Sequence, residues 1–136
     1  MPGLPPLDEI LEDYQLVDAE DRYRLLIDLG RQLEPMPDAL KTDATKVPGC
    51  SASVWVYPTV ANDRLHFLAD SNAAITKGIV ALVLSAVQDK PAADVARMDV
   101  AAELAPFELG KHLSANRTQG VPNMIKLVTD TAERYA

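Results

Sequence analysis

Two strand-forming segments constrain the fold of this chain most, because they lie close together and can pair. Residues 53–57 are rich in β-branched and aromatic side chains. Residues 64–69 alternate in polarity, with apolar side chains at every second position from Leu65. Asn62 and Asp63, between the segments, are typical turn residues. We therefore predict an antiparallel hairpin.

Helical periodicity surrounds this hairpin. Before it we predict two helices, the second of which begins at the N-cap Asp18 and ends by Pro35. After it we expect a third helix, capped by Asp70-Ser71-Asn72 and broken before Pro91, and a C-terminal helix. The apolar positions that define the four helices are Leu7, Ile10, Leu11 and Tyr14; Leu25, Leu26, Leu29 and Leu33; Ile75, Ile79, Leu82, Val83 and Ala86; and Val121, Met124, Ile125, Val128 and Ala132.

Other parts of the chain lack a sustained period. Residues 36–47 mix proline, aspartate, threonine and lysine, which predicts a loop. Residues 98–109 are expected to be less regular, after a short turn of helix at 92–96. Helices around one hairpin are typical of an α+β domain. We therefore predict a single domain over residues 1–136, with a small antiparallel β-sheet and helices packed against it.

Composition disfavours several classes of function. The formal net charge is −7 and no basic run occurs, so binding to nucleic acid or to anionic lipid is not expected. The start of the chain lacks the regions of a signal peptide, and no apolar run approaches the length of a membrane span. One cysteine cannot form an internal disulfide, which fits a reducing compartment. We predict a cytoplasmic protein.

The single cysteine lies in the sequence Pro48-Gly49-Cys50, directly before the first predicted strand. Proline restricts one backbone dihedral, and glycine tolerates the positive φ that a type II turn requires. The thiol of Cys50 should therefore lie at a bend, where it can meet another protein, and Lys46 could favour its thiolate. The alternative is that Cys50 is a small buried apolar residue.

Other chemistries find less support. Cys50, His66 and His112 match no zinc-ligand spacing, so we expect no metal site. Gly110 and Gly120 lack the spacing of a phosphate-binding loop. Two alternatives stay open: a small thiol hydrolase that uses Cys50 with His66 or His112, and a non-catalytic interaction module with an inert cysteine.

Three blocks of the sequence are far more specific in combination than singly. They are Pro48-Gly49-Cys50 followed by Val54-Trp55; Asp70-Ser71 with Lys77-Gly78; and Leu113-Ser114 with Arg117 and Gly120. In order and spacing they resemble the SufE family of sulfur-acceptor proteins, over nearly the whole chain. The chain departs from the usual family pattern at Ser51 and Ala52, where glutamine and serine are usual, and at Asn72, where aspartate is common.

The resemblance implies a function. Members of the family accept sulfur from the persulfide of a cysteine desulfurase that uses pyridoxal phosphate, and pass it to iron-sulfur cluster assembly. The protein would be a sulfur acceptor and an activator of the desulfurase, with Cys50 as the persulfide carrier. It would have no stand-alone enzyme activity and bind no cofactor, since pyridoxal phosphate belongs to the partner. The downstream partner would be an iron-sulfur scaffold complex or another sulfur acceptor. Residues expected to position the loop or to contact a partner are Lys46, Arg117, Asp70, Ser71 and Asn72.

Sulfur carriage fits a chain with one cysteine. A second thiol nearby could resolve the persulfide into a disulfide and lose the sulfur. The carried sulfur also needs protection from solvent, which favours a loop that tucks Cys50 against apolar neighbours and swings outward when a partner docks. Val47 and Val54 are the candidates for that apolar lining.

Overall fold

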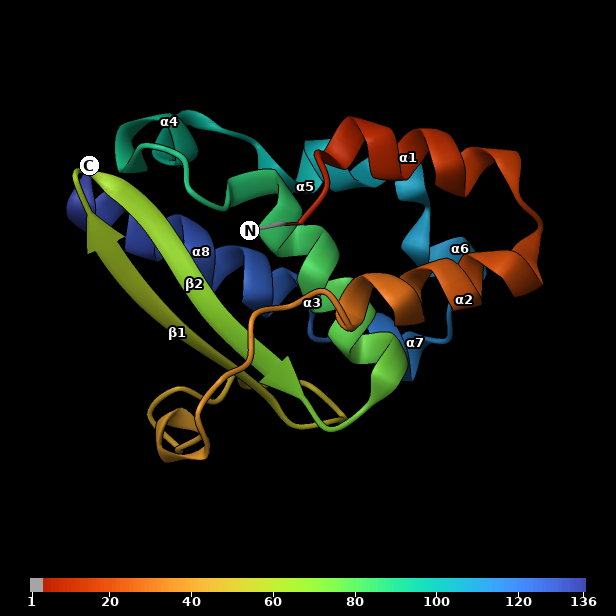
Figure 1. Ribbon diagram of the computed structural model, residues 1–136, viewed down its shortest axis with the longest axis horizontal. Helices are drawn as coiled ribbons and strands as arrows, with labels where there is room; N and C mark the ends of the chain where they lie inside the picture. The colour runs from red at the N-terminus through yellow and green to blue at the C-terminus, as the bar shows by residue number, and fades with distance from the viewer. Residues whose placement is uncertain (1–3) are drawn as a thin grey trace.

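The computed structural model describes residues 4–136, apart from the side chains of His112, Asn116 and Arg117. The strands β1 (Val54–Ala61) and β2 (Arg64–Ser71) form a hairpin along one side of the molecule, and helices make up the rest (Figure 1). The helices are α1 (Leu7–Leu16), α2 (Ala19–Gly30), α3 (Ala74–Val87), α4 (Ala92–Arg97), α5 (Val100–Leu104), α6 (Leu109–His112), α7 (Ala115–Thr118) and α8 (Val121–Tyr135), with 3-10 turns at Asp38–Leu40 and Ala105–Phe107. This arrangement confirms the α+β prediction.

The antiparallel hairpin is confirmed. Val54 pairs with Ser71 at its open end, and Asn62 and Asp63 take positive φ angles of 53° and 64° at its turn. Two consecutive left-handed residues match the right-handed twist of the strands that they join. The inward face of β2 is buried in the core at Leu65, Phe67 and Ala69.

Strand β1 runs to Ala61, beyond its predicted end at Tyr57. Pro58 lies inside the strand and is opposite Phe67 in the register. Proline lacks an N–H group, so it is tolerated at the edge of a sheet, where that group has no ladder partner. The proline therefore lies within the strand and does not end it.

The segment after α3 covers the outer edge of β2. Gln88 Nε2 donates to the carbonyl of Phe67, and Gln88 Oε1 accepts from the N–H of Phe67, each at 2.8 Å. The N–H of Leu65 donates to the carbonyl of Lys90 at 2.9 Å. These bonds satisfy backbone groups that an open edge would expose, and they fasten the end of α3 to the sheet.

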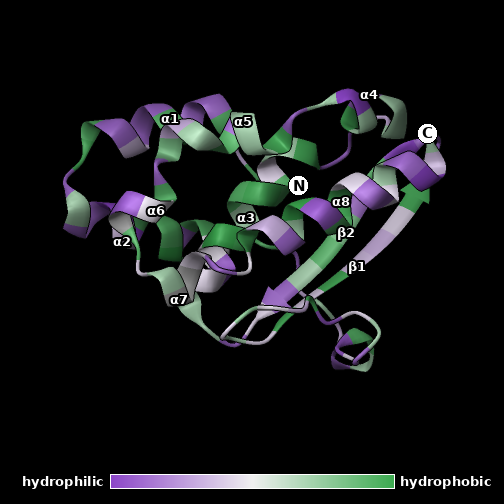
Figure 2. Cartoon of the chain, turned by 180° about the vertical axis from the view of Figure 1, so that it is seen from behind, coloured by the Kyte–Doolittle hydropathy of each residue, from purple (hydrophilic) through white to green (hydrophobic). Residues whose placement is uncertain are grey.

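Helix α3 is the centre of the core. Hydrophobic residues cover most of its surface, whereas α8 alternates between polar and apolar residues (Figure 2). Helices α2 and α3 approach closely at two glycines: a Cβ added to Gly30 would lie 2.9 Å from the backbone nitrogen of Gly78. The four helices predicted from apolar periodicity are all present, and Asp18 caps α2 by accepting from the N–H of Asp21 at 3.0 Å.

The predicted cap of α3 is wrong. The helix begins at Ala74, and its N-cap residue Ala73 makes no side-chain capping bond. Asp70 and Ser71 belong to β2 instead, because the pairing with β1 continues to the end of that strand. Asn72 uses its side chain elsewhere, on the loop that holds the cysteine.

The segment 98–109 is more regular than predicted. Asp99 caps α5 by accepting from the N–H of Ala102 at 3.1 Å. Val100, Leu104 and Phe107 are buried, at positions i, i+4 and i+7. An aspartate cap before that spacing is a helix signal that the prediction overlooked. Within the described residues, no helix is both long and apolar enough to cross a membrane.

Candidate functional site

The cysteine lies in a closed loop whose two ends are fixed in the core. The N–H of Val47 donates to the carbonyl of Val54 at 2.8 Å, and both side chains are buried. Residues 48–53 therefore form a short loop between paired segments. Gly49 has a φ of 80°, so the predicted left-handed glycine before Cys50 is confirmed.

The thiol of Cys50 is tucked against the start of α8. The side chain is partly buried and packs on the core. Its Sγ lies directly over Gly120, where an added Cβ would overlap it. Burial raises the pKa of the Cys50 thiol. The free protein thus holds a protonated, shielded thiol at neutral pH.

The expected thiolate stabilisation by Lys46 is not found among the described residues. Lys46 is exposed, and its backbone forms an isolated bridge with Trp55 at the base of the loop. Among the described residues, burial is the cause that raises the Cys50 pKa. The side chain of Arg117 lies outside the described residues, so its predicted role stays a prediction.

Two asparagine side chains bond the two ends of the loop of residues 48–53. The side-chain oxygen of Asn72 accepts from the N–H of Ser53 at 3.1 Å. Asn123 Nδ2, on the first turn of α8, donates to the carbonyl of Pro48 at 2.7 Å. An aspartate at position 72 would offer the same acceptor oxygen, so that departure from the family pattern keeps the contact. Asn123 was not predicted, since a polar residue in a first helical turn carries no signal for a distant loop.

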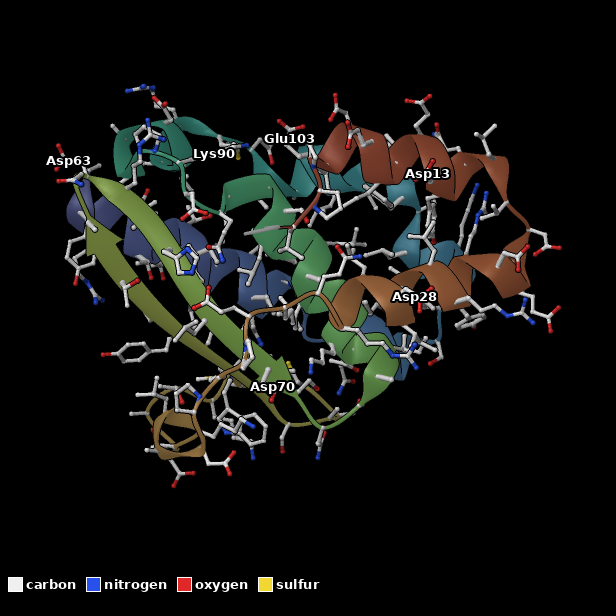
Figure 3. The ribbon with its side chains drawn as sticks, viewed as in Figure 1. Asp13, Asp28, Asp63, Asp70, Lys90 and Glu103 are labelled. Atoms are coloured by element: carbon white, nitrogen blue, oxygen red, sulfur yellow. The ribbon has the colours of Figure 1, made fainter. Side chains whose placement is uncertain are left out.

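Asp70 lies close to the base of this loop and joins three segments (Figure 3). Its carboxylate binds Lys41 Nζ at 2.8 Å and Lys77 Nζ at 3.2 Å, and it accepts from the N–H of Ser71 at 2.8 Å. Partial burial acts to raise the pKa of Asp70, but the hydrogen bonds from Lys41, from the Ser71 backbone and from Lys77 outweigh it, and the net pKa is lowered. Ser71 Oγ accepts from the N–H of Ala73 at 3.3 Å, which helps to turn the chain into α3.

His66 does not lie with the cysteine. Its register position is five residues along β2 from Ser71, which pairs with Val54 at the cysteine end of the hairpin. At about 3.3 Å per residue this corresponds to roughly 16 Å of strand. The structure therefore gives no support to a hydrolase that pairs Cys50 with His66, and the side chain of His112 is outside the described residues.

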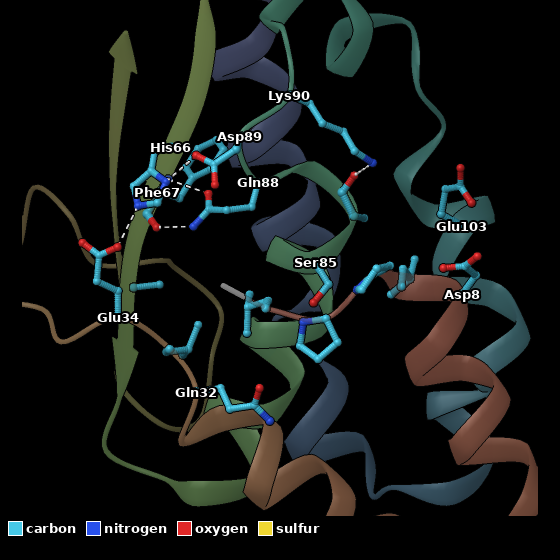
Figure 4. Close-up of a pocket in the computed structure, with 17 residues that line it drawn as sticks. Asp8, Gln32, Glu34, His66, Phe67, Ser85, Gln88, Asp89, Lys90 and Glu103 are labelled. Carbon is cyan, nitrogen blue, oxygen red and sulfur yellow. Dashed lines mark hydrogen bonds and ion pairs between the residues drawn. The ribbon is translucent and has the colours of Figure 1, made fainter. Parts of the chain in front are cut away.

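His66 instead joins two carboxylates beside a pocket of about 600 Å³ (Figure 4). Nδ1 contacts Asp89 at 2.7 Å, and Nε2 contacts Glu34 at 3.0 Å. Partial burial alone lowers the pKa of His66, but the hydrogen bonds to Asp89 and Glu34 outweigh it, and the net pKa is raised. The other charged residues that line this pocket are Asp8, Lys90 and Glu103.

We expect His66 to make the stability of the domain depend on pH. Its folded-state pKa lies above the ordinary value of 6.5, so its contribution is complete below that pH and is lost as pH rises through the folded-state pKa. The contribution stays below about 1 kcal/mol, because the group is partly exposed. Urea unfolding at pH 6 and pH 8 should show this loss in the wild type, and His66→Gln should remove it. An equal pH dependence in both proteins would contradict the assignment.

In the part of the chain that the structure describes, no group of three or more histidine, cysteine, aspartate or glutamate side chains is placed to hold a metal ion.

Sequence comparison identifies the family. Residues 8–132 match the SufE family, described as the Fe-S metabolism associated domain. The chain belongs to the SufE family. An uncharacterized SufE-like protein of Rhizobium meliloti is 36% identical over 132 residues, which cover 93% of this chain and 94% of that protein. The sulfur acceptor protein CsdE of Escherichia coli is 42% identical over 107 residues, covering 78% of this chain and 73% of that protein.

A solved structure shows the same fold. The solution structure of a hypothetical protein from Thermus thermophilus superposes with a TM-score of 0.77 and covers 98% of each chain, at 15% identity. The SufE fold places Cys50, Gly120 and Asn123 together, although the sequence separates the first from the others by about seventy residues.

Proposed function

We propose that this SufE-family protein is a sulfur acceptor that takes persulfide sulfur from a cysteine desulfurase on Cys50 and passes it to iron-sulfur cluster assembly. The observation that carries the proposal is the placement of a single shielded thiol on a short closed loop, in a chain of this family. The sulfur acceptor protein of Escherichia coli, with 42% identity, supports the same role.

The transfer needs one thiolate and no cofactor on this chain. Cys50 loses its proton, and its Sγ attacks the outer sulfur of the partner's cysteine persulfide. The S–S bond of the donor breaks, the partner's cysteine leaves as a thiolate, and Cys50 carries the new persulfide. A second exchange hands that sulfur to an acceptor thiol. Pyridoxal phosphate serves the desulfurase, in the step that creates the donor persulfide.

The partial burial of Cys50 protects its sulfur between these two exchanges. Burial raises its pKa, and a protonated thiol is a weak nucleophile and resists oxidation. Docking that lifts the loop would remove the burial and restore thiolate character. Lys46 and Arg117 remain candidates to contact the partner or to stabilise the thiolate. A free thiol that must open to its partners persists best in a reducing compartment, which supports action in the cytoplasm.

Intact-protein mass tests the proposal. After incubation with a cysteine desulfurase, pyridoxal phosphate and L-cysteine, the wild type should gain one sulfur, about 32 Da, that reductant removes. Cys50→Ser should gain none. If the wild-type mass stays unchanged while its thiol can still be alkylated after unfolding, the carrier function is wrong, and the inert-cysteine alternative becomes the better one.

A further inference from the structure

A side-chain hydrogen bond joins the loop of residues 48–53 to helix α8. We propose that Asn123 is a latch that keeps this loop seated on α8, and that its release exposes Cys50. The latch contact is present in the free protein. Its part in sulfur transfer rests on the function proposed above.

The contact joins parts of the chain that are 75 positions apart. Asn123 Nδ2 lies 2.7 Å from the carbonyl oxygen of Pro48, at the point where the chain leaves its pairing with β1. The left-handed Gly49 follows, and a Cβ at this position would overlap Asn123 Nδ2. The loop backbone thus fits closely against this one amide.

The thiol packs at the start of α8, beside the turn that carries Asn123. Gly120 and Asn123 are three positions apart, so they face the same side of the helix. The Cys50 side chain packs on Gly120, while Asn123 bonds the carbonyl of Pro48, two residues before the cysteine. On the other side, Asn72 holds Ser53 and belongs to the segment that leads into α3. Release at Asn123 therefore lifts the cysteine side of the loop and leaves its far end attached.

The strength of the latch suits reversible opening of the loop. One hydrogen bond shifts an equilibrium between closed and open loops by roughly three- to tenfold. The contacts of a docking partner can supply a free energy of this size and open the loop.

Alkylation of Cys50 by iodoacetamide tests the latch without a desulfurase. Asn123→Ala removes the donor, and Asn123→Asp keeps the shape but has no N–H group to donate. Both should raise the alkylation rate of the native protein about three- to tenfold, where tenfold corresponds to about 1.4 kcal/mol. Lys126→Ala is the matched control, because Lys126 is exposed on the same helix and bonds Asp130 within it. It should leave the rate unchanged.

A second variant opens the loop by a different route. Gly120→Ala places a methyl group where Sγ lies, so it should also speed alkylation, and adding Asn123→Ala to it should give little further increase. Wild-type rates in both Asn123 variants would overturn the proposal. So would a rate increase fully matched by a loss of global stability in urea, because opening would then be unfolding. Absence of sulfur acceptance in the wild type would instead contradict the proposed function and leave the latch standing.

Discussion

Gly78→Ala is expected to destabilise the domain by about 3 kcal/mol, because it inserts a methyl group between two helices in backbone contact. A Cβ at Gly78 would overlap the carbonyl oxygen of Leu26 in α2 and lie 2.6 Å from its carbonyl carbon. Neither atom belongs to a flexible side chain, so α2 and α3 must move apart. That movement would open the core around Leu26 and Ile79, which are 1% and 0% exposed. Urea unfolding followed by far-UV circular dichroism measures the effect.

Gly110→Ala is the matched control. It makes the same change in helix α6, where no heavy atom lies within 4 Å of an added Cβ. Alanine loses less backbone entropy than glycine on folding, so this variant should be unchanged or more stable, by up to about 1 kcal/mol. A loss of similar size in both variants would show that helix geometry, and not the α2–α3 contact, determines the cost.

Asp70→Asn is expected to lower the stability at neutral pH by about 2 kcal/mol and to remove part of its acid dependence. The carboxylate is 18% exposed and is bonded by two lysines from separate segments. Its folded-state pKa lies below the ordinary value of 3.8. Its contribution is therefore present above that pH and is lost as pH falls from there through the folded-state pKa. The amide keeps the shape and the bond to Ser71 but not the charge.

The measurement is the urea midpoint of wild type and Asp70→Asn at pH 7 and pH 3. The difference between the two proteins should be largest at pH 7 and should shrink at pH 3. Asp38→Asn is the control, because Asp38 also pairs with Lys41 but is 97% exposed. It should change the stability by less than about 0.5 kcal/mol. A pH-independent difference for Asp70→Asn would mean that the carboxylate charge is not what joins these segments.

Local rules in the sequence were sufficient for most elements. The turn at Asn62 and Asp63 and the left-handed Gly49 depend on backbone preference, and the cap at Asp18 depends on a side-chain bond to the next turn; all three are local and all are present. Apolar periodicity located the long helices because a buried helical face repeats within its own segment. The cap expected at Asp70-Ser71-Asn72 failed because pairing with β1 determines where β2 ends, and that pairing involves residues far away in the sequence.

The candidate site was likewise predictable only in part from the sequence. The sequence by itself determined that one thiol lies at a turn before a strand, because a proline, a glycine and a single cysteine stand next to one another. Tertiary structure alone decided the surroundings of the thiol. Cys50 Sγ lies over Gly120, and Asn123 and Asn72 bond the two ends of its loop. Asp70 binds two lysines close to the base of that loop. These contacts join distant parts of the chain and have no periodicity. They exist because packing of α3 and α8 brings those parts together.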